Sequence, residues 1–277
     1  MEGRWKNLGA ITPTSLVEAR FQLHYAAQVV SGVGRSWIPR EADDSHTSLV
    51  WLESFQALAG AGLEGKTPLR VALEVATMRL LLLDADSGEL GSFALAGRTL
   101  AEAYAWVGGE ITARRGDDPG EFAPLHYELP EHPLAAGTPF DANQTMGTAE
   151  LTRWFSNAHH VLSAVSREQG ASPVRCWPHH FDIAVLIGLG GGRSIGVGLS
   201  PGDSAYPEPY WYVGPWPHPK PEKWPELPAG KWHTAGFTAA VLTGTELVAH
   251  ARQEGILGQF LDAAVAGCRT LLESSHQ

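Results

Sequence analysis

Two histidines and an aspartate stand where an apolar strand is predicted to begin. His179, His180 and Asp182 come directly before the run 183–187, which reads Ile-Ala-Val-Leu-Ile. Because unpaired polar groups are costly to bury, their position at this point suggests a chemical role. Residues i and i+2 of an extended chain share a face, so we expect His180 and Asp182 to point the same way.

A third candidate ligand, His233, stands much later in the chain at the head of another predicted strand. His-x-Asp with a distant histidine is the pattern of a two-histidine, one-carboxylate metal site. We expect His180, Asp182 and His233 to hold a divalent metal (zinc, iron or manganese) that lowers the pKa of a bound water for hydrolysis of a small organic substrate. A non-haem Fe(II) oxygenase-like activity is an alternative, although residues 238–245 contain no basic residue to clamp a 2-oxoglutarate carboxylate. Such a triplet also arises by chance, and Asp182 could instead cap a turn.

Two further residues are candidates for acid–base chemistry. Glu208 lies between Pro207 and Pro209, which restrict its backbone, so its carboxylate is expected to be rigidly held as a general acid or base. The same residue could simply be a surface charge in a turn. His24 lies beside Leu23 in a predicted helix and is either an auxiliary catalytic group or a buried structural histidine. A metal-free acid–base enzyme using Asp182 and Glu208 is a further alternative.

The segment 206–232 is dense in aromatic residues and proline. Planar rings offer a large contact area at low entropic cost, which suits the wall of a ligand pocket. The chain could therefore be a non-catalytic binding protein for a small molecule or a carbohydrate, or the segment could be a surface excursion held by its rings. The residues expected to contact a ligand are Tyr206, Tyr210, Trp211, Trp216 and Trp177.

The elements that position these residues repeat their order in two halves. Each half is predicted as a helix, antiparallel strands and a second helix, which indicates the α+β class and an internal duplication about a pseudo-two-fold axis. We expect an N-terminal half at 1–113, an irregular connection at 114–148 and a C-terminal half at 149–277. The predicted elements are residues 14–31, 48–52, 55–58, 69–75, 79–85, 90–95 and a helix after Thr99, then 150–169, 181–188, 194–199, 210–213, 233–242 and 258–272.

Composition narrows the class of protein. The 277 residues carry a formal net charge of −10 without a cluster of Lys and Arg, which argues against nucleic acid and anionic membranes as partners. The first six residues contain no apolar signal-peptide core, and no run of about 18 apolar residues is present. We therefore expect a cytoplasmic protein with a small-molecule substrate. The pattern defines neither that substrate nor the oligomeric state.

Short motifs are spread over most of the chain, namely Leu23-His24, Gln28-Val29-Val30, Ser172-Pro173-Val174, Trp177, Phe181-Asp182 with Ala184, and Tyr206-Pro207-Glu208-Pro209. Together they resemble an uncharacterised bacterial family, domain of unknown function 5996. The resemblance implies that His24, Asp182 and Glu208 occupy positions that the family also uses, and the family carries no established activity. Small residues precede the Phe-Asp pair in the family pattern, whereas His179 and His180 stand there in this chain. A metal site with His180 would therefore belong to a subgroup, or the histidines are incidental.

Overall fold

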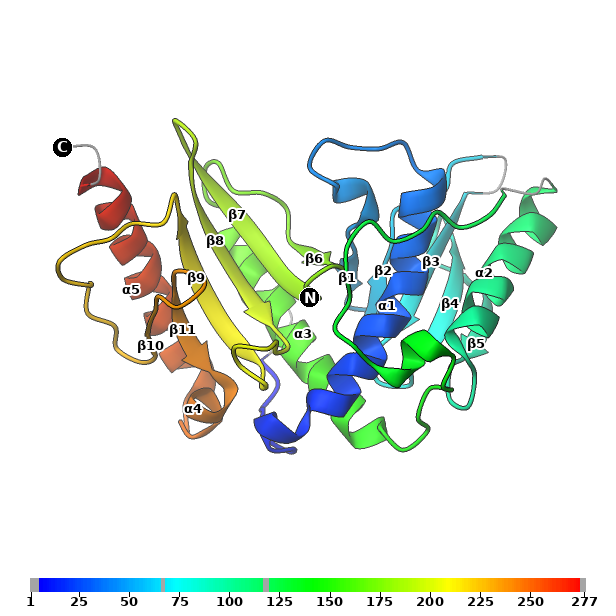
Figure 1. Ribbon diagram of the computed structural model, residues 1–277, viewed down its shortest axis with the longest axis horizontal. Helices are drawn as coiled ribbons and strands as arrows, with labels where there is room; N and C mark the ends of the chain where they lie inside the picture. The colour runs from blue at the N-terminus through cyan, green and yellow to red at the C-terminus, as the bar shows by residue number, and fades with distance from the viewer. Residues whose placement is uncertain (1–4, 66–67, 117–119, 275–277) are drawn as a thin grey trace. The chain divides into compact units, whose positions relative to one another are not determined.

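The structure is a computed structural model that describes residues 5–65, 68–116 and 120–274. The described residues form helices and antiparallel sheets, which confirms the α+β class (Figure 1). The internal duplication stays a prediction. Residues 1–4 of the expected N-terminal half, 117–119 of the expected connection and 275–277 lie outside the described part.

The chain divides into two compact units, and each takes segments from both predicted halves. Unit 1 comprises residues 1–17, 153–174 and 182–277, and unit 2 comprises 18–152 and 175–181. Each unit is described by itself below.

Unit 2 contains a five-stranded antiparallel meander in the order β1-β2-β3-β4-β5. Buried alanines and leucines of β2, β3 and β4 form one of its core clusters. The second helix begins after Thr99, as the sequence predicts, and the structure adds a capping box in which Thr99 and Glu102 bond each other's backbone N–H groups. The elements are α1 (Val17–Trp37), β1 (Val50–Leu52), β2 (Ala57–Ala59), β3 (Leu69–Glu74), β4 (Arg79–Asp84), β5 (Glu89–Ala94), α2 (Leu100–Arg115) and β6 (Arg175–Trp177), with short 3-10 turns at Ser45–Thr47 and Pro133–Ala136.

The predicted end of the first helix at residue 31 is wrong, because α1 continues through Gly32 and Gly34 to Trp37. A Cβ atom on Gly34 would lie 2.0 Å from the carbonyl oxygen of His46. Gly34 therefore allows a close approach between helix and loop rather than ending the helix.

Unit 1 contains strands β7 to β11, which are antiparallel and lie in the order β10-β11-β9-β8-β7. The single strand predicted at 233–242 is two strands, of which β10 ends at His233. The unit's elements are β7 (Asp182–Gly190), β8 (Arg193–Ser200), β9 (Tyr210–Trp216), β10 (Lys231–His233), β11 (Ala239–Thr243), α4 (Gly244–Val248) and α5 (Gln253–Ser274), with a 3-10 turn at Pro13–Ser15 and the part of α3 (Thr145–Val165) that follows residue 152.

The two faces of this sheet differ in character. One face packs against α5, where the Cys268 thiol lies 3.8 Å from the carbonyl oxygen of Val213 (Figure 1). Alternation places Trp211 on this buried face and Tyr210 and Tyr212 on the other. The face opposite to α5 therefore carries the polar and aromatic side chains of the candidate site.

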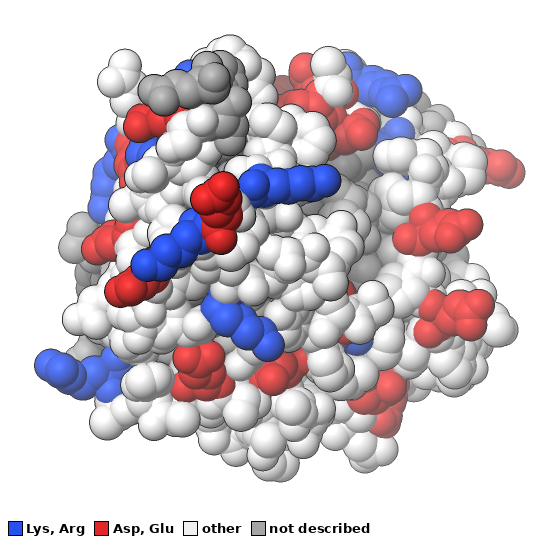
Figure 2. Space-filling view, turned by 60° about the vertical axis from the view of Figure 1, so that its left-hand side comes forward, with Lys and Arg blue, Asp and Glu red and all other residues white. Residues whose placement is uncertain are grey.

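No helix in the described ranges is long and apolar enough to cross a membrane. On the face shown in Figure 2, lysine and arginine side chains are interspersed with acidic and uncharged ones. Both cysteines, Cys176 and Cys268, are buried, and neither takes part in a disulfide.

We expect Gly34→Ala to lower the free energy of unfolding by about 1–3 kcal/mol, because its Cβ would overlap the His46 carbonyl. The matched control is Gly109→Ala in α2, where a Cβ meets nothing within 4 Å. That substitution should raise the free energy of unfolding by about 0.5–1 kcal/mol. Urea unfolding of both variants measures the difference, and equal effects would contradict the close approach.

Candidate functional site

The residues singled out from the sequence fall into different units. His24, Trp177 and His180 belong to unit 2. Unit 1 holds the rest, namely Asp182, Tyr206, Glu208, Tyr210, Trp211, Trp216 and His233.

In unit 2, His24 is buried in α1 with 4% of its surface exposed. Its Nε2 lies 2.8 Å from the carbonyl oxygen of Pro178, so Nε2 carries the proton and donates. The imidazole also stacks on Phe181, with ring centroids 5.2 Å apart and planes 8° from parallel. His24 therefore holds the segment 175–181 against α1.

Gln28, one helical turn after His24, completes this attachment. Its Nε2 donates to the carbonyl oxygens of Pro178 at 2.8 Å and His24 at 3.1 Å. Its Oε1 accepts from the Tyr127 hydroxyl at 2.7 Å, and the Tyr104 hydroxyl donates to its backbone carbonyl at 3.0 Å. Sequence reasoning missed this role, although Gln28 stands in the resemblance pattern together with His24.

The pKa values in this network favour neutral groups. Burial lowers the pKa of His24 to about 4, against the hydrogen bond to Pro178, and the nearby Arg20 lowers it further. Burial raises the pKa of Tyr127 to about 12, so its hydroxyl remains a donor to Gln28. A neutral, enclosed His24 favours a positioning role over the auxiliary catalytic role expected from the sequence.

His179 and His180 form an exposed imidazole pair in unit 2, with ring centroids 4.4 Å apart. The His179 ring contacts Tyr127 and Trp177 edge-on, at 5.8 and 6.2 Å between centroids. Partial desolvation of the His179 ring by its neighbours lowers its pKa to about 4, and His180 adds to this effect. Trp177 therefore lies beside an imidazole pair in unit 2.

The expected sharing of a face by His180 and Asp182 is wrong. Strand β7 begins at Asp182, and Phe181 has a left-handed φ of 59°. The extended alternation on which the expectation depended therefore stops before His180 is reached. The stack of the Phe181 ring on His24 accompanies this turn of the backbone.

His233 uses both ring nitrogens within unit 1. Its Nε2 donates to the carbonyl oxygen of Ala235 at 2.6 Å, so Nδ1 is the acceptor for the Tyr206 hydroxyl at 2.9 Å. Its ring stacks on Phe237, with centroids 4.1 Å apart. Within the described part of the chain, no group of three or more His, Cys, Asp or Glu side chains is placed to hold a metal. The metal site of His180, Asp182 and His233 that the sequence suggests stays a prediction.

Asp182 is bonded across a strand. The hydroxyl of Tyr212, on β9, donates to the Asp182 carboxylate, on β7. The strand between them carries Gly198, where an added Cβ would lie 2.6 Å from the Tyr212 hydroxyl oxygen and 2.9 Å from the Ala184 Cβ. The phenol ring therefore lies over a position that has no side chain.

A second tyrosine–carboxylate pair lies next to the first. Tyr210 donates to Asp203 at 2.6 Å, and the other oxygen of Asp203 accepts from the backbone N–H groups of Ala205 and Tyr206. Burial and Asp203 together raise the pKa of Tyr210. The ring centroids of Tyr206 and Tyr210 are 5.0 Å apart, and those of Tyr210 and Tyr212 are 6.3 Å apart. The outer face of the sheet therefore carries a continuous row of tyrosines bonded to acidic groups and, through Tyr206, to His233.

Glu208 acts locally at the start of α4. Its Oε2 accepts from the backbone N–H of Thr245 at 2.5 Å. A carboxylate at a helix N-terminus stabilises the exposed N–H groups. This contact favours a structural role for Glu208 in the turn over a role as a general acid or base.

The two tryptophans of β9 expected to share a pocket lie on opposite faces. Trp211 is fully buried on the face covered by α5, whereas Trp216 is 55% exposed. Trp216 lies on the same face as Tyr212, because the two are four residues apart on one strand. Trp211 therefore contributes to the core rather than to the ligand-contact surface expected from the sequence.

Between Tyr212 and Trp216 the outer face of the sheet carries two glycines. Gly214 separates them on β9, and its register partner on β8 is Gly196. A Cβ on Gly196 would lie 3.8 Å from the Tyr212 ring, an ordinary contact, whereas a Cβ on Gly214 would lie 3.3 Å from the Thr238 carbonyl oxygen. Leu186, 52% exposed on β7, is the register partner of Gly196 on the other side. We call Gly196 and Gly214 the glycine floor.

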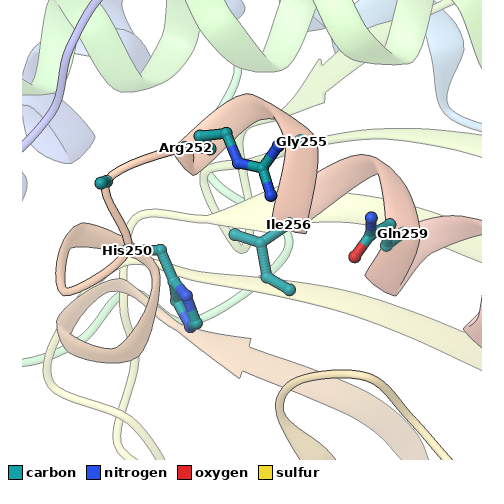
Figure 3. A pocket seen from close by; sticks show the side chains of 6 residues that line it. His250, Arg252, Gly255, Ile256 and Gln259 are labelled. Atoms are coloured by element: carbon teal, nitrogen blue, oxygen red, sulfur yellow. The ribbon is translucent and has the colours of Figure 1, made fainter.

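A surface pocket of about 250 Å³ lies elsewhere in unit 1, at the start of α5. Its lining comes from one continuous segment, with Ile256 between His250 and Gln259 (Figure 3). His250, Arg252 and Gln259 are exposed. None of the residues singled out from the sequence lines this pocket.

Comparisons with protein-family models, with curated proteins and with solved structures found no match. The resemblance to domain of unknown function 5996 stays a prediction.

The two glycines of β8 give a contrasting pair of variants. We expect Gly198→Ala to lower the free energy of unfolding by about 1–3 kcal/mol, because the added Cβ would displace the Tyr212 ring. Gly196→Ala should leave it unchanged or raise it by up to about 1 kcal/mol, since its Cβ fits and the unfolded chain loses freedom. Thermal or urea unfolding measures both, and equal destabilisation would contradict the placement of Tyr212.

Protonation of His24 makes unit 2 sensitive to acid. The pKa of His24 is lowered in the folded state from 6.5 to about 4, so its contribution to stability is present above pH 6.5 and is lost as the pH falls toward 4. His24→Gln keeps an N–H donor for Pro178 but does not titrate. Between pH 7 and pH 4 the wild type should lose about 3 kcal/mol more of its unfolding free energy than this variant does. Urea unfolding of the wild type, His24→Gln and the exposed control His250→Gln over this pH range measures the difference. Parallel curves of unfolding free energy against pH for the wild type and His24→Gln would contradict the lowered pKa of His24.

Proposed function

We propose that unit 1 binds a small organic molecule on the glycine floor, between the Tyr212–Asp182 pair and Trp216. The observation that carries the proposal is the pairing of Gly196 with Gly214 at neighbouring register positions, on a face where Leu186 and Trp216 are exposed. Adjacent glycines in strands weaken a sheet unless something approaches its backbone closely. A flat ligand lying on the bare backbone supplies such an approach.

The surroundings of the floor match the usual make-up of a ligand site. Such sites are largely apolar, with a few well-placed polar groups that fix orientation. Leu186 and Trp216, both exposed, supply the apolar and aromatic contacts around the floor. Tyr212 and Asp182 supply the polar end, and their hydrogen bond fixes both side chains.

Binding is better supported than metal-assisted hydrolysis. Both ring nitrogens of His233 are bonded within unit 1, and the extended backbone that would place His180 and Asp182 on one face is interrupted at Phe181. The remaining acidic groups, Asp203 and Glu208, fix a turn and a helix start. Binding without a chemical step is the function that these contacts favour.

The test is a screen of small organic molecules by amide NMR. We expect compounds that bind to shift the backbone N–H resonances of Gly196 and Gly214. Gly196→Val fills the floor with a residue that suits a strand and should weaken those compounds at least about tenfold. Gly258→Ala in α5, where a Cβ meets nothing within 4 Å, is the matched control and should bind normally. Compounds that bind Gly196→Val as tightly as the wild type, or a screen that moves neither resonance, would contradict the proposal.

A further inference from the structure

We propose that the turn at residues 177–181 in unit 2 holds a divalent transition metal through the imidazoles of His179 and His180. This site is separate from the ligand binding proposed for unit 1, and it shares only His180 with the metal site that the sequence suggests. Three observations carry the proposal: the backbone of the turn is anchored, both imidazoles lack hydrogen bonds to the protein, and the spacing of the two rings fits one metal.

The backbone of this turn is anchored at both of its ends. The Phe181 N–H donates to the Trp177 carbonyl at 2.7 Å and closes the turn. The Pro178 carbonyl accepts from Nε2 of His24 and from Nε2 of Gln28, each at 2.8 Å. The Phe181 ring stacks on the His24 ring. A metal that binds between these anchors does not have to order the backbone, which is one of the main costs of binding.

Both imidazoles at the tip of the turn are accessible to a metal. His179 and His180 are exposed, and neither ring makes a hydrogen bond to a described residue. His24 and His233 differ in this respect, because each bonds the protein through a ring nitrogen. A neutral imidazole is the commonest protein ligand of transition metals. Metal binding at the turn would therefore replace water and break no hydrogen bond of the protein.

The separation of the two rings indicates the kind of metal. Their centroids are 4.4 Å apart. With metal–nitrogen bonds of about 2.0–2.1 Å, two imidazoles bound at a right angle have centroids roughly 4.5 Å apart, against roughly 5.2 Å at the tetrahedral angle. Right angles belong to tetragonal coordination, which is typical of Cu²⁺ and Ni²⁺, whereas zinc sites are tetrahedral. The pair therefore favours Cu²⁺ and Ni²⁺ over Zn²⁺.

The groups around the pair are compatible with a bound cation. The titratable groups that act on the charge of His179 are His180, Asp44 and His126, of which Asp44 is the acid. The Asp44 carboxylate is 43% exposed and lies 3.9 Å from Nε2 of His126 and 3.9 Å from Nε of Arg40. Among the described residues no third His, Cys, Asp or Glu converges with the pair on one point. The protein therefore supplies two ligands, and water completes the coordination.

The test adds one equivalent of Cu²⁺ to the full chain, in buffer that contains glycine as a weak competitor. Electron spin echo envelope modulation counts the imidazoles on the metal, and we expect two in the wild type and one in His180→Gln. The affinity for Cu²⁺, measured by competition, should fall at least about tenfold in this variant, because one of two nitrogen ligands is lost. One imidazole in the wild type, or equal affinities of the two proteins, would overturn the proposal.

Two control variants locate the metal at the turn. His250→Gln removes an exposed histidine of unit 1 and should leave the Cu²⁺ affinity and the imidazole count unchanged. His126→Gln removes the neighbouring imidazole that lies beside Asp44, and it should weaken Cu²⁺ by less than about threefold. A tenfold loss in either control would overturn the assignment to the His179–His180 pair. Amide NMR spectra of the metal-free variants confirm that each remains folded.

The ring spacing also predicts the order of the metals. Cu²⁺ binds nitrogen ligands most tightly of the first-row divalent metals, so its first place does not depend on geometry. Ni²⁺ and Zn²⁺ differ in the angle that they prefer, and calorimetric titration of the wild type should show tighter binding of Ni²⁺. Tighter binding of Zn²⁺ would indicate a tetrahedral site and contradict the right-angle arrangement of the two rings.

Discussion

The hydrogen bond between Tyr212 and Asp182 depends on the absence of a side chain at residue 198. The phenol ring crosses the middle strand at Gly198, where any Cβ would overlap the ring. Beside the ring, Gly196 and Gly214 are the next glycines along the strands, and the ring edge lies 3.8 Å from where a Gly196 Cβ would be. The glycine at 198 thus fixes the polar end of the candidate site next to its floor.

In unit 2, by contrast, the polar side chains that the sequence points to are buried inside the fold. There His24 and Gln28 are buried and donate to one backbone carbonyl, that of Pro178, while two tyrosine hydroxyls bond the side-chain and backbone oxygens of Gln28. Buried polar networks stabilise a single arrangement only when their members find partners. These bonds connect two helices with segments distant in sequence. His24 therefore has a structural reason for standing in a conspicuous polar pattern, which is its bond to the Pro178 carbonyl.

Much of the fold could be predicted from local pattern. The meander from β3 to β5 follows from alternation and a Ser-Gly turn, and the start of α2 follows from the Thr99–Glu102 capping box. The density of aromatic residues alone groups Trp211 with its neighbours as a ligand contact. The alternation of Tyr210, Trp211 and Tyr212 along one strand indicates instead that Trp211 faces the core. Local periodicity is reliable where each residue's environment is set by its own strand.

The site itself depends on contacts between distant segments, which no local pattern contains. The left-handed turn at Phe181 accompanies the stack of its ring on His24, more than 150 positions earlier, and the two ring nitrogens of His233 are occupied through Tyr206 and the loop at Ala235. The pairing of Gly196 with Gly214 requires the register of β8 on β9. The measurement that tests the central claim most directly is the set of intermolecular nuclear Overhauser effects from a bound compound that shifts the Gly196 and Gly214 amide resonances. The account predicts contacts to the Trp216 indole and the Leu186 methyl groups; contacts to His250 and Ile256 without these would place the ligand in the other pocket and contradict it.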